Sequence, residues 1–329
     1  MVVAETKTLV IGGTGLVGRF LLNQLLQYGH SVDVVTRNAA KLTISSASVR
    51  AVVADIASPD WLQHSALHLA EYDVVYHLAY ATTGDDAYDR AVTVDSVRAV
   101  IEGLRAIVDG RSRHFVYTGS MVVFGSMPGD HIVTEASVKN GDTPYASNKI
   151  AATQLALQAG PGLLCTVLHP TGVYAEYSSR IDSYRELLSR NYVPDHLSRH
   201  GVNNIIYADD LARALVQCLN RPRDHLAEEY IVNGESKLFT EWFAELASTV
   251  RRRSWIQLPV FTRHVCRGPL RRLLNSVGIG CPLPFAEKKE SVFERKTTFC
   301  SGKARAHFGF DPQTLFQRVC QRLQEEAAR

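Results

Sequence analysis

Short apolar, β-branched runs alternate with segments of helical periodicity through the first half of the chain. Such runs predict β-strands at residues 8–11, 31–36, 49–53, 74–77, 114–118 and 163–169. Strands that alternate with helices pair in parallel and are covered by helices on both faces. We therefore predict an α/β fold with a doubly wound parallel sheet, whose ligands bind at the carboxyl ends of the strands.

The second half of the chain is less regular and predicts a smaller, mixed lobe. Residues 229–232 form a further apolar run that predicts a strand. Two sets of apolar residues have helical spacing: Leu211, Leu215, Cys218 and Leu219, and then Phe243, Leu246, Ala247 and Val250. No internal repeat or low-complexity segment occurs in the chain, so both halves are expected to be globular.

Composition adds little beyond this globular class. The 329 residues are 46% hydrophobic, which is ample for a sizeable core, and the net charge of +3 is too small to favour a nucleic-acid partner. Six cysteines are scattered without a Cys-x-x-Cys pair, which argues against a zinc ribbon and for reduced thiols in a cytoplasmic protein. We therefore expect no metal site and no nucleic-acid partner.

Insertion into a membrane is not expected either. The first predicted strand begins near the N-terminus without a cleavable signal peptide ahead of it, and no run of about 18 apolar residues exists. Arginines recur between residues 251 and 272, where a membrane-surface helix is one interpretation. Because Pro259 and Pro269 interrupt any long helix there, we favour a solvated lid over the substrate.

The first strand is linked to a helix pattern by a glycine-rich turn, Gly12-Gly13-Thr14-Gly15-Leu16-Val17-Gly18. Gly12 allows a tight turn, Gly15 lets the backbone approach a pyrophosphate, and Gly18 lets the helix pack against the strand. An ordinary strand-to-helix turn is the alternative interpretation. The place of the motif within a βαβ unit favours dinucleotide binding. The contacts expected from this turn are those of Gly12, Thr14, Gly15, Leu16, Val17 and Gly18.

The end of the second strand decides which dinucleotide is expected. An acidic side chain there would bind the adenosine ribose, but the chain has Arg37, which can pair with a 2′-phosphate. Asp33 lies inside the strand and is poorly placed to act as that acid. NADP(H) is therefore the favoured cofactor, and NAD(H) is the alternative if Arg37 is a solvated surface residue. Asp55 and Ile56 end the third strand and are placed to reach the adenine, unless Asp55 caps a helix.

Tyr145 and Lys149 are spaced so that a helix would present both on one face. A phenol with a pKa near 10 is a poor acid–base at neutral pH. A neighbouring ammonium and a positively charged nicotinamide would lower that pKa, and the phenol could then exchange a proton with a carbonyl or alcohol oxygen during hydride transfer. Ser120 follows the fifth strand, where its hydroxyl can hold the same oxygen. A Tyr-x-x-x-Lys pair alone is common on surfaces, and its position at the glycine-turn edge of the sheet is what favours catalysis.

These features predict two lobes. A dinucleotide-binding Rossmann domain is expected over residues 1–175, with its sheet completed by about 203–233. The substrate-binding lobe is expected from residues 176–202 and 234–329. Within these, segments 176–203 and 237–299 are expected to close the substrate cleft. The aromatic residues that would either line this cleft or form the core of the small lobe are Tyr177, Tyr184, Trp255 and Phe261.

Taken together, the motifs resemble the extended short-chain dehydrogenase/reductases, which include sugar-nucleotide epimerases, dihydroflavonol reductases and hydroxysteroid dehydrogenases. The matching segments are 12–18, 55–56, 77–79, 120–125, 145–149, 170–174 and 207–211. The resemblance implies Ser120, Tyr145 and Lys149 as the catalytic residues. It also implies that the cofactor is contacted by Lys149 and by Leu78, Ala79, Tyr80, Pro170, Thr171 and Val173.

Several positions depart from the pattern of that superfamily and leave the subfamily open. His169 precedes Pro170 where arginine is usual, and Asp95 stands where asparagine is common. Tyr207 replaces a frequent histidine, and Ala175 replaces a glycine. None of these departures removes a group that the expected chemistry needs.

The substrate is less well indicated than the cofactor. Sugar-nucleotide members usually carry an Arg-Asp-Phe-like segment before the pair Asp209-Asp210, and residues 199–206 lack it. In this respect the chain resembles the reductases more than the epimerases, although arginines in the second half could hold a phosphate. Dehydration is disfavoured because no acidic pair accompanies Ser120. Asp209 and Asp210 are expected to cap a helix that starts at Leu211.

Three functions therefore stay open at this point. The first is an NADP(H)-dependent oxidoreductase that interconverts a carbonyl and a secondary alcohol on a small organic molecule. The second is a sugar-nucleotide epimerase or 4-ketoreductase. The third is a non-catalytic, dinucleotide-binding redox sensor, which the phenol–ammonium pair disfavours. The expected partner is a small-molecule substrate, and a homodimer is one expected assembly.

Overall fold

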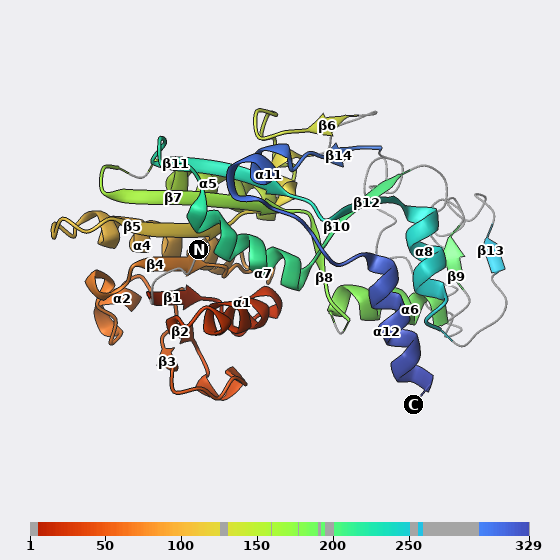
Figure 1. Ribbon diagram of the computed structural model, residues 1–329, viewed down its shortest axis with the longest axis horizontal. Coiled ribbons are helices and arrows are strands. Elements are labelled where there is room, and N and C mark those ends of the chain that lie inside the picture. Colours follow the sequence, from red (N-terminus) through yellow and green to blue (C-terminus); the bar gives the residue numbers. More distant parts are fainter. Residues whose placement is uncertain are drawn as a thin grey trace.

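The computed structural model describes residues 6–125, 131–158, 160–176, 178–189, 192–194, 201–250, 256–258 and 296–328. Within these ranges, a seven-stranded parallel sheet forms the main body, in the order β11–β7–β5–β4–β1–β2–β3 (Figure 1). Its strands are β1 (Lys7–Ile11), β2 (Ser31–Thr36), β3 (Val49–Val53), β4 (Val74–His77), β5 (Arg113–Thr118), β7 (Leu163–Pro170) and β11 (Ala227–Val232). The predicted doubly wound α/β fold is confirmed.

Helices cover both faces of this sheet, as the alternating pattern predicts. The helices of the main body are α1 (Leu16–Gln27), α2 (Trp61–His64), α3 (Asp86–Arg90), α4 (Ser96–Arg105), α5 (Pro144–Leu157), α7 (Ala208–Gln217) and α11 (Gly302–Phe308). A π-helical turn, Ala91–Asp95, joins α3 to α4, and short 3₁₀ turns lie at Ala39–Lys41, Leu69–Glu71, Met121–Phe124 and Cys218–Asn220. Strand β6 (Ile132–Val133) pairs with β14 (Thr298–Phe299).

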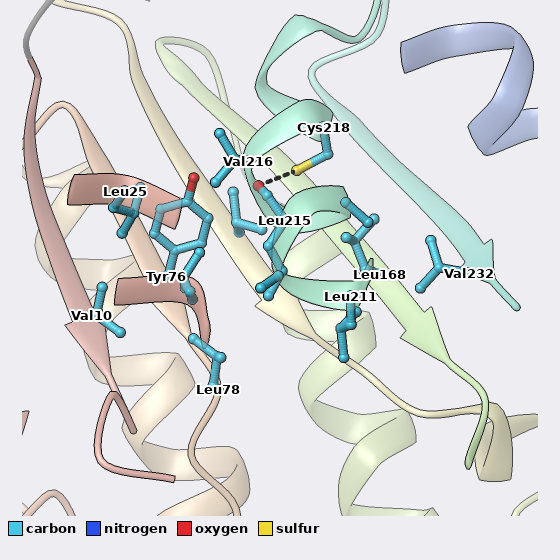
Figure 2. Packing of buried hydrophobic residues seen from close by; sticks show 14 of the residues in the cluster. Val10, Leu25, Tyr76, Leu78, Leu168, Leu211, Leu215, Val216, Cys218 and Val232 are labelled. Carbon is cyan, nitrogen blue, oxygen red and sulfur yellow. Dashed lines mark hydrogen bonds between the residues drawn. The ribbon is translucent and has the colours of Figure 1, made fainter. Parts of the chain in front are cut away.

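Alternate side chains of the central strands enter two different hydrophobic cores, because successive residues of a strand point to opposite faces. Val10 of β1 and Tyr76 of β4 pack with α1 and α7 in the first core, shown in Figure 2. Leu9 and Val75 pack with α4 and α5 in the second core, on the other face. The continuous apolar runs in the sequence are therefore strands that are buried on both faces.

A smaller lobe lies to the right of the main sheet in Figure 1, where β8 and β10 lead from the main body toward it. Its mixed sheet has the order β12–β10–β8, with β8 (Gly172–Tyr174) parallel and β12 (Glu235–Leu238) antiparallel to β10 (Val202–Tyr207). The helices of this lobe are α6 (Ser179–Ser189), α8 (Phe239–Ala247) and α12 (Phe316–Ala328). A further strand pair joins β9 (Tyr192–Pro194) to β13 (Ile256–Leu258). The smaller, mixed lobe that the sequence predicts is thus present.

A third core, which is rich in aromatic side chains, holds the small lobe together. Trp242 of α8 stacks on Phe316 of α12, with their ring centroids 5.1 Å apart. Tyr184 of α6 meets the Trp242 ring edge-on at 4.8 Å. Of the two interpretations that the sequence leaves open for Tyr184, a place in the core of the lobe is the one that the structure shows.

The helix after β10 corrects one expectation. Asp209 and Asp210 do not cap a helix that starts at Leu211, because α7 already begins at Ala208 and its N-cap is Tyr207. Asp210 is buried in the first turn, where its two carboxylate oxygens accept backbone N–H groups of Gln313 and Thr314, at 3.0 and 2.9 Å. The side chain therefore anchors a distant segment instead of its own helix end.

Some sequence-based expectations fall on parts of the chain that the structure does not describe. Apart from strand β13, the lid expected between residues 251 and 272 lies outside the described residues, as do Tyr177, Trp255 and Phe261. The division into lobes at residue 175 stays a prediction. Strand β11 joins the main sheet, whereas β10 belongs to the mixed sheet of the small lobe. No helix among the described residues combines the length and the apolar composition that crossing a membrane requires.

Candidate active site

A cavity of about 720 Å³ opens at the carboxyl ends of β1, β2 and β4. The chain leaves β1 toward β2 on one side and leaves β4 toward β5 on the other, so the strand order reverses between β1 and β4. Ligands of open α/β sheets bind at such a reversal. The residues that line the cavity are Ile11, Gly12, Thr14, Gly15, Val35, Thr36, Arg37, Asn38, Lys41, Ala54, Asp55, Ile56, Leu78, Ala79, Tyr80, Ala81, Thr82, Thr83, Tyr88 and Val92.

The glycine-rich turn forms the floor of this cavity. Gly12 has a φ of +92°, and a Cβ atom there would lie 2.8 Å from the backbone nitrogen of Ala79. At Gly18, a Cβ atom would lie 2.5 Å from the carbonyl oxygen of Gly12. Gly15 is the N-cap of α1 and has no side chain that could bond the first-turn amides. The turn thus brings a bare helix N-terminus to the cavity, which is an arrangement suited to a phosphate.

Two basic side chains line the cavity just after β2. The Arg37 guanidinium donates to the hydroxyl of Tyr88 at 2.5 Å, which links the β2 loop to α3 across the cavity. Neither Arg37 nor Lys41 forms an ion pair with any described residue. Asp33 is turned away, since its carboxylate binds Arg50 and accepts the hydroxyl of Tyr72 at 2.6 Å. Two basic side chains without an ion-pair partner among the described residues thus lie at the β2 end of the cavity.

Asp55 and Ile56 also line the cavity. The alternative interpretation of Asp55 as a helix cap is not what the structure shows, since α2 has Asp60 as its N-cap. The Asp55 carboxylate instead accepts the backbone N–H of Ala57 at 3.1 Å. The Asp55 side chain is exposed.

Other predicted cofactor residues do not line this cavity. Val17 and Val173 pack against the first hydrophobic core. Thr171 is buried, and its hydroxyl donates to Asn233 at 3.0 Å. Leu16, Gly18 and Pro170 are likewise absent from the cavity lining. Cofactor contacts from these six residues stay a prediction.

Ser120 and Tyr145 meet at the carboxyl end of β5. Ser120 follows the strand, and its hydroxyl accepts the backbone N–H of Val122 at 3.4 Å. Tyr145 lies in the first turn of α5, which begins with Pro144 and is capped by the hydroxyl of Thr143 at 3.1 Å. A hydrogen bond joins the Ser120 and Tyr145 side chains. The fold therefore brings together two groups that are distant in the sequence.

The pKa of Tyr145 differs from the value expected from the motif. Burial and the nearby Tyr80 raise the pKa of the phenol to about 12, and the hydrogen bond with Ser120 lowers it by less. The expected lowering of this pKa is not met in the chain without a bound nicotinamide, because burial raises the pKa and the hydrogen bond with Ser120 offsets only part of that rise. The phenol is consequently protonated at neutral pH.

Lys149 lies one turn further along α5 and is buried, with 1% of its surface exposed. Its ammonium donates to the carbonyl oxygen of Thr118 at 2.8 Å. The rings of Tyr117 and Tyr80 lie 4.8 and 5.3 Å from the nitrogen, as cation–π partners. Burial lowers the pKa of Lys149 to about 7. The protonation of Lys149 is therefore close to balance at neutral pH.

Tyr80 connects the cavity to these three residues. It follows β4, lines the cavity, and has a ring centroid 5.5 Å from that of Tyr145. With 55% of its surface exposed, its ring is open to a ligand. None of the three predicted catalytic residues is itself in the cavity lining, and Tyr80 is the lining residue that contacts Tyr145 and Lys149.

A match to a family model covers residues 8–233, which include both the glycine-rich turn and the Ser120–Tyr145–Lys149 cluster. The matched family is the NAD dependent epimerase/dehydratase family. The chain belongs to this family. Members bind a nicotinamide dinucleotide, and the chain is of the extended short-chain dehydrogenase/reductase type.

Individual relatives of this family member are distant. A 4-hydroxy-2-methyl-3-oxo-4-farnesyl-3,4-dihydroquinoline-1-oxide ketoreductase from Stigmatella aurantiaca is 27% identical over 176 residues. The match covers 51% of the chain and 50% of that relative, so the chain spans about half the length of the curated relative that it matches.

Solved structures resemble the whole chain. A UDP-glucose 4-epimerase from Thermotoga maritima, with UDP-glucose, has a TM-score of 0.72 and 15% identity, over 98% of this chain and 100% of the other. A UDP-glucuronic acid 4-epimerase from Bacillus cereus, with NAD, has a TM-score of 0.70 and 15% identity over the same shares. At these identities the likeness shows the fold alone.

Several site residues of this family member could not be found by motif. Lys41 and Tyr88 line the cavity from a 3₁₀ turn and a short helix, and only the basic pair four residues apart, Arg37 and Lys41, gives a signal in the sequence. Tyr117 is a strand residue whose apolar setting looks like ordinary core. No group of histidine, cysteine and acidic side chains that could hold a metal ion is found in the described part of the chain.

Proposed function

We propose that this protein is an NADP(H)-dependent oxidoreductase that interconverts a carbonyl and a secondary alcohol on a small organic molecule. The observation that carries the proposal is the half-buried Tyr145 phenol, which is hydrogen-bonded to Ser120 and packs against Tyr80 of the cavity lining. The cavity has the volume of a cofactor or ligand site. A bound nicotinamide would supply or accept the hydride. The protein residues then have to move one proton and hold one oxygen.

The proposed reduction uses the side chains of Tyr145, Ser120 and Lys149. As hydride adds to the carbonyl carbon, the electron pair of the C=O π bond moves to the oxygen, which takes the proton of the Tyr145 hydroxyl. The Ser120 hydroxyl would hold the same oxygen. Lys149, one turn further along α5, would in its charged form stabilise the phenolate that remains. Because the pKa of Tyr145 is raised to about 12, the phenol is in the donor state that reduction requires.

Support for NADP(H) over NAD(H) comes from Arg37 and Lys41. Both line the cavity after β2, and neither forms an ion pair among the described residues. A 2′-phosphate would offer them an anionic partner, and a phosphate–arginine pair is a strong, geometrically defined contact. The acid that a ribose diol would need at the end of β2 is absent, since Asp33 is bound to Arg50.

Reaction on a sugar nucleotide is the second candidate. It is favoured by the fold, since a UDP-glucose 4-epimerase resembles 98% of this chain. An epimerase returns the hydride to its substrate and consumes no cofactor, whereas a reductase oxidises one nicotinamide for each turnover. A 4-ketoreductase would share the proton chemistry proposed for Tyr145 and differ only in the substrate.

The test is a two-stage assay of the purified full chain. Binding of NADPH and NADH is first titrated by the fluorescence of the reduced nicotinamide. Loss of its absorbance is then followed with apolar ketones, quinones and 4-keto-sugar nucleotides, while UDP-sugars are examined for epimerised product. Oxidation of NADPH with a non-sugar carbonyl supports the proposal. Binding of NADPH without turnover of any carbonyl or sugar would leave the redox-sensor alternative and overturn an enzymatic role.

Two further expectations belong with this proposal. A homodimer and a cytoplasmic location are both proposed from the sequence, and neither enters the chemistry above. The mass of the purified protein in solution tests the first, and fractionation of the source cells tests the second.

A further inference from the structure

A buried histidine lies directly behind Ser120. His169 is the residue of β7 next to the end of β5, and none of its surface is exposed. Its Nδ1 atom accepts the backbone N–H of Ser120 at 3.3 Å. Its Nε2 atom lies 2.9 Å from a carboxylate oxygen of Glu229 on β11. Both ring nitrogens are therefore engaged, and one of them holds the backbone of a predicted catalytic residue.

The ring is also confined by packing. A Cβ atom on Gly119 would lie 2.5 Å from Nδ1 of His169, so the close approach depends on glycine at that position. The ring of Phe124 meets the imidazole edge-on at 5.5 Å. The imidazole thus has little freedom to tilt away from Ser120.

The carboxylate of Glu229 determines which nitrogen carries the proton. Glu229 also binds Lys139, with 2.6 Å between the nitrogen and the second carboxylate oxygen. Hydrogen bonds from His169 and Lys139 outweigh burial and hold the pKa of Glu229 below its usual value, so the group is an acceptor. The imidazole must then donate through Nε2, which leaves Nδ1 free of a proton and able to accept from Ser120.

We propose that His169 and Glu229 form a positioning pair that sets the Ser120 loop in the geometry that its hydroxyl needs. Glu229 fixes the Nε2–H tautomer of His169, and Nδ1 of His169 anchors the backbone of Ser120. The part of the proposal that concerns turnover rests on the proposed function. The anchoring itself does not, because it is a contact within the folded chain.

Two substitutions at one position separate the anchor from the bulk of the ring. In His169→Asn, the amide oxygen can take the place of Nδ1 and accept from Ser120. In His169→Gln, the longer amide reaches toward Glu229 and leaves Ser120 without its acceptor. We expect His169→Gln to lower kcat by roughly ten- to hundredfold, because small displacements of reacting groups cost that much. His169→Asn should keep kcat within about threefold of the unmodified protein, and the KM for the cofactor should stay within about twofold in both.

A readout without substrate keeps the inference independent of the proposed function. Hydrogen exchange of the Ser120 amide should be faster in His169→Gln than in His169→Asn or in the unmodified protein. If the two variants exchange alike, or if His169→Gln keeps its kcat, the positioning role is overturned. Absence of turnover in the unmodified protein would instead contradict the proposed function and leave the exchange result to decide the anchoring.

The role of Glu229 is tested by the imidazole ¹⁵N spectrum, in which His169 is assigned from its loss in His169→Asn. The unmodified protein should show the Nε2–H tautomer at His169. The amide introduced by Glu229→Gln has one oxygen and one NH2 group, so its NH2 group has to face either Lys139 or His169. Where it faces His169, Nε2 must accept a hydrogen bond and the proton moves to Nδ1. A mixture of tautomers is therefore expected. An unchanged single tautomer would remove Glu229 from the pair.

Discussion

The proposed reaction depends on the hydroxyl of Tyr145, and replacement by phenylalanine removes that group alone. We expect Tyr145→Phe to lower the turnover rate by roughly two to four decades, because a positioned acid–base is lost. The affinity for the reduced cofactor should stay nearly unchanged, because the partner of the lost hydroxyl is Ser120 of the protein and the aromatic ring stays in place. Rates with the best carbonyl of the panel, together with fluorescence titration of the cofactor, measure both effects.

The matched control for this substitution is Tyr28→Phe, which removes the hydroxyl of an exposed tyrosine that follows α1. Its turnover should equal that of the unmodified protein. Retention of most activity by Tyr145→Phe would show that another group supplies the proton.

Arg37 is the residue on which the proposed cofactor preference depends. Arg37→Asp should weaken NADPH binding, because it removes the partner of the 2′-phosphate and adds a repelling charge. Binding of NADH should be unchanged or tighter, so the ratio of the two dissociation constants is the quantity to measure. Arg98→Asp, on the exposed side of α4, makes the same change of charge away from the cavity and should leave the ratio unaltered. Tighter binding of NADH than of NADPH by the unmodified chain would contradict the preference itself.

Single residues also show where sequence reasoning stops. The glycine turn was predictable because the backbone conformation at Gly12 and the close contact at Gly18 exclude other side chains. The direction of the Tyr145 pKa was not, because it depends on how deeply the fold buries the phenol. A motif specifies which groups meet, and the surrounding packing sets their proton affinity.

At the scale of elements, α7 connects the core to the C-terminal part of the chain through Asp210. Its buried carboxylate accepts two backbone N–H groups from residues 313 and 314 and also binds Arg213. Asp210→Asn would place amide hydrogens against one of these donors and remove the charge. We expect the free energy of unfolding to fall by about 2 kcal/mol, the usual scale for a hydrogen bond to a charged group. Urea denaturation measures the change.

Asp209→Asn is the comparison within the same helix turn. Asp209 is one-third exposed and binds the side chain of Gln24 at 2.8 Å, so its loss should be much smaller. Equal losses for the two variants would mean that the contact of Asp210 with residues 313 and 314 contributes little.

The strands were predictable from the sequence nearly to the residue, while two other kinds of feature were not. Strands β2, β3 and β4 have the predicted bounds. Strand β4 is buried along its whole length and gives an uninterrupted apolar run, whereas the edge strand β3 is only partly buried and was recognised by its valines. The start of α7 was misplaced, because two acids at its first turn look like caps until their distant partners are seen. The mixed pairing of β10 depends on long-range contacts that leave no periodic signal.

For the whole molecule, burying Lys149 at the site has a cost in stability that depends on pH. Burial lowers its pKa from 10.5 to about 7, so between these values the unfolded chain binds more protons than the folded one. The stability of the protein therefore rises with pH across this window, and the full penalty applies below about pH 7. We expect Lys149→Met to be more stable than the unmodified protein below pH 7, with an advantage that shrinks as the pH rises toward 10.5.

Urea unfolding of Lys149→Met and of the unmodified protein across this pH range gives the difference in their free energies of unfolding. The titration of all other groups contributes equally to both proteins and cancels in this difference. Lys41→Met, at an exposed lysine, is the control because no charge is desolvated there. A difference between Lys149→Met and the unmodified protein that does not change with pH would show that Lys149 keeps its ordinary proton affinity in the folded state.

The third core has a consequence for how new substrate preferences can arise. Its residues come from four separate stretches, within 174–188, 205–208, 239–246 and 316–323. Between these stretches the chain returns to the main body, where β11 joins the large sheet and α11 packs into the first core (Figure 1). The small lobe is therefore not a cassette that recombination could exchange by a single crossover. A hybrid with a relative would have to transfer all four stretches together, so gradual substitution is the more accessible route to a new specificity.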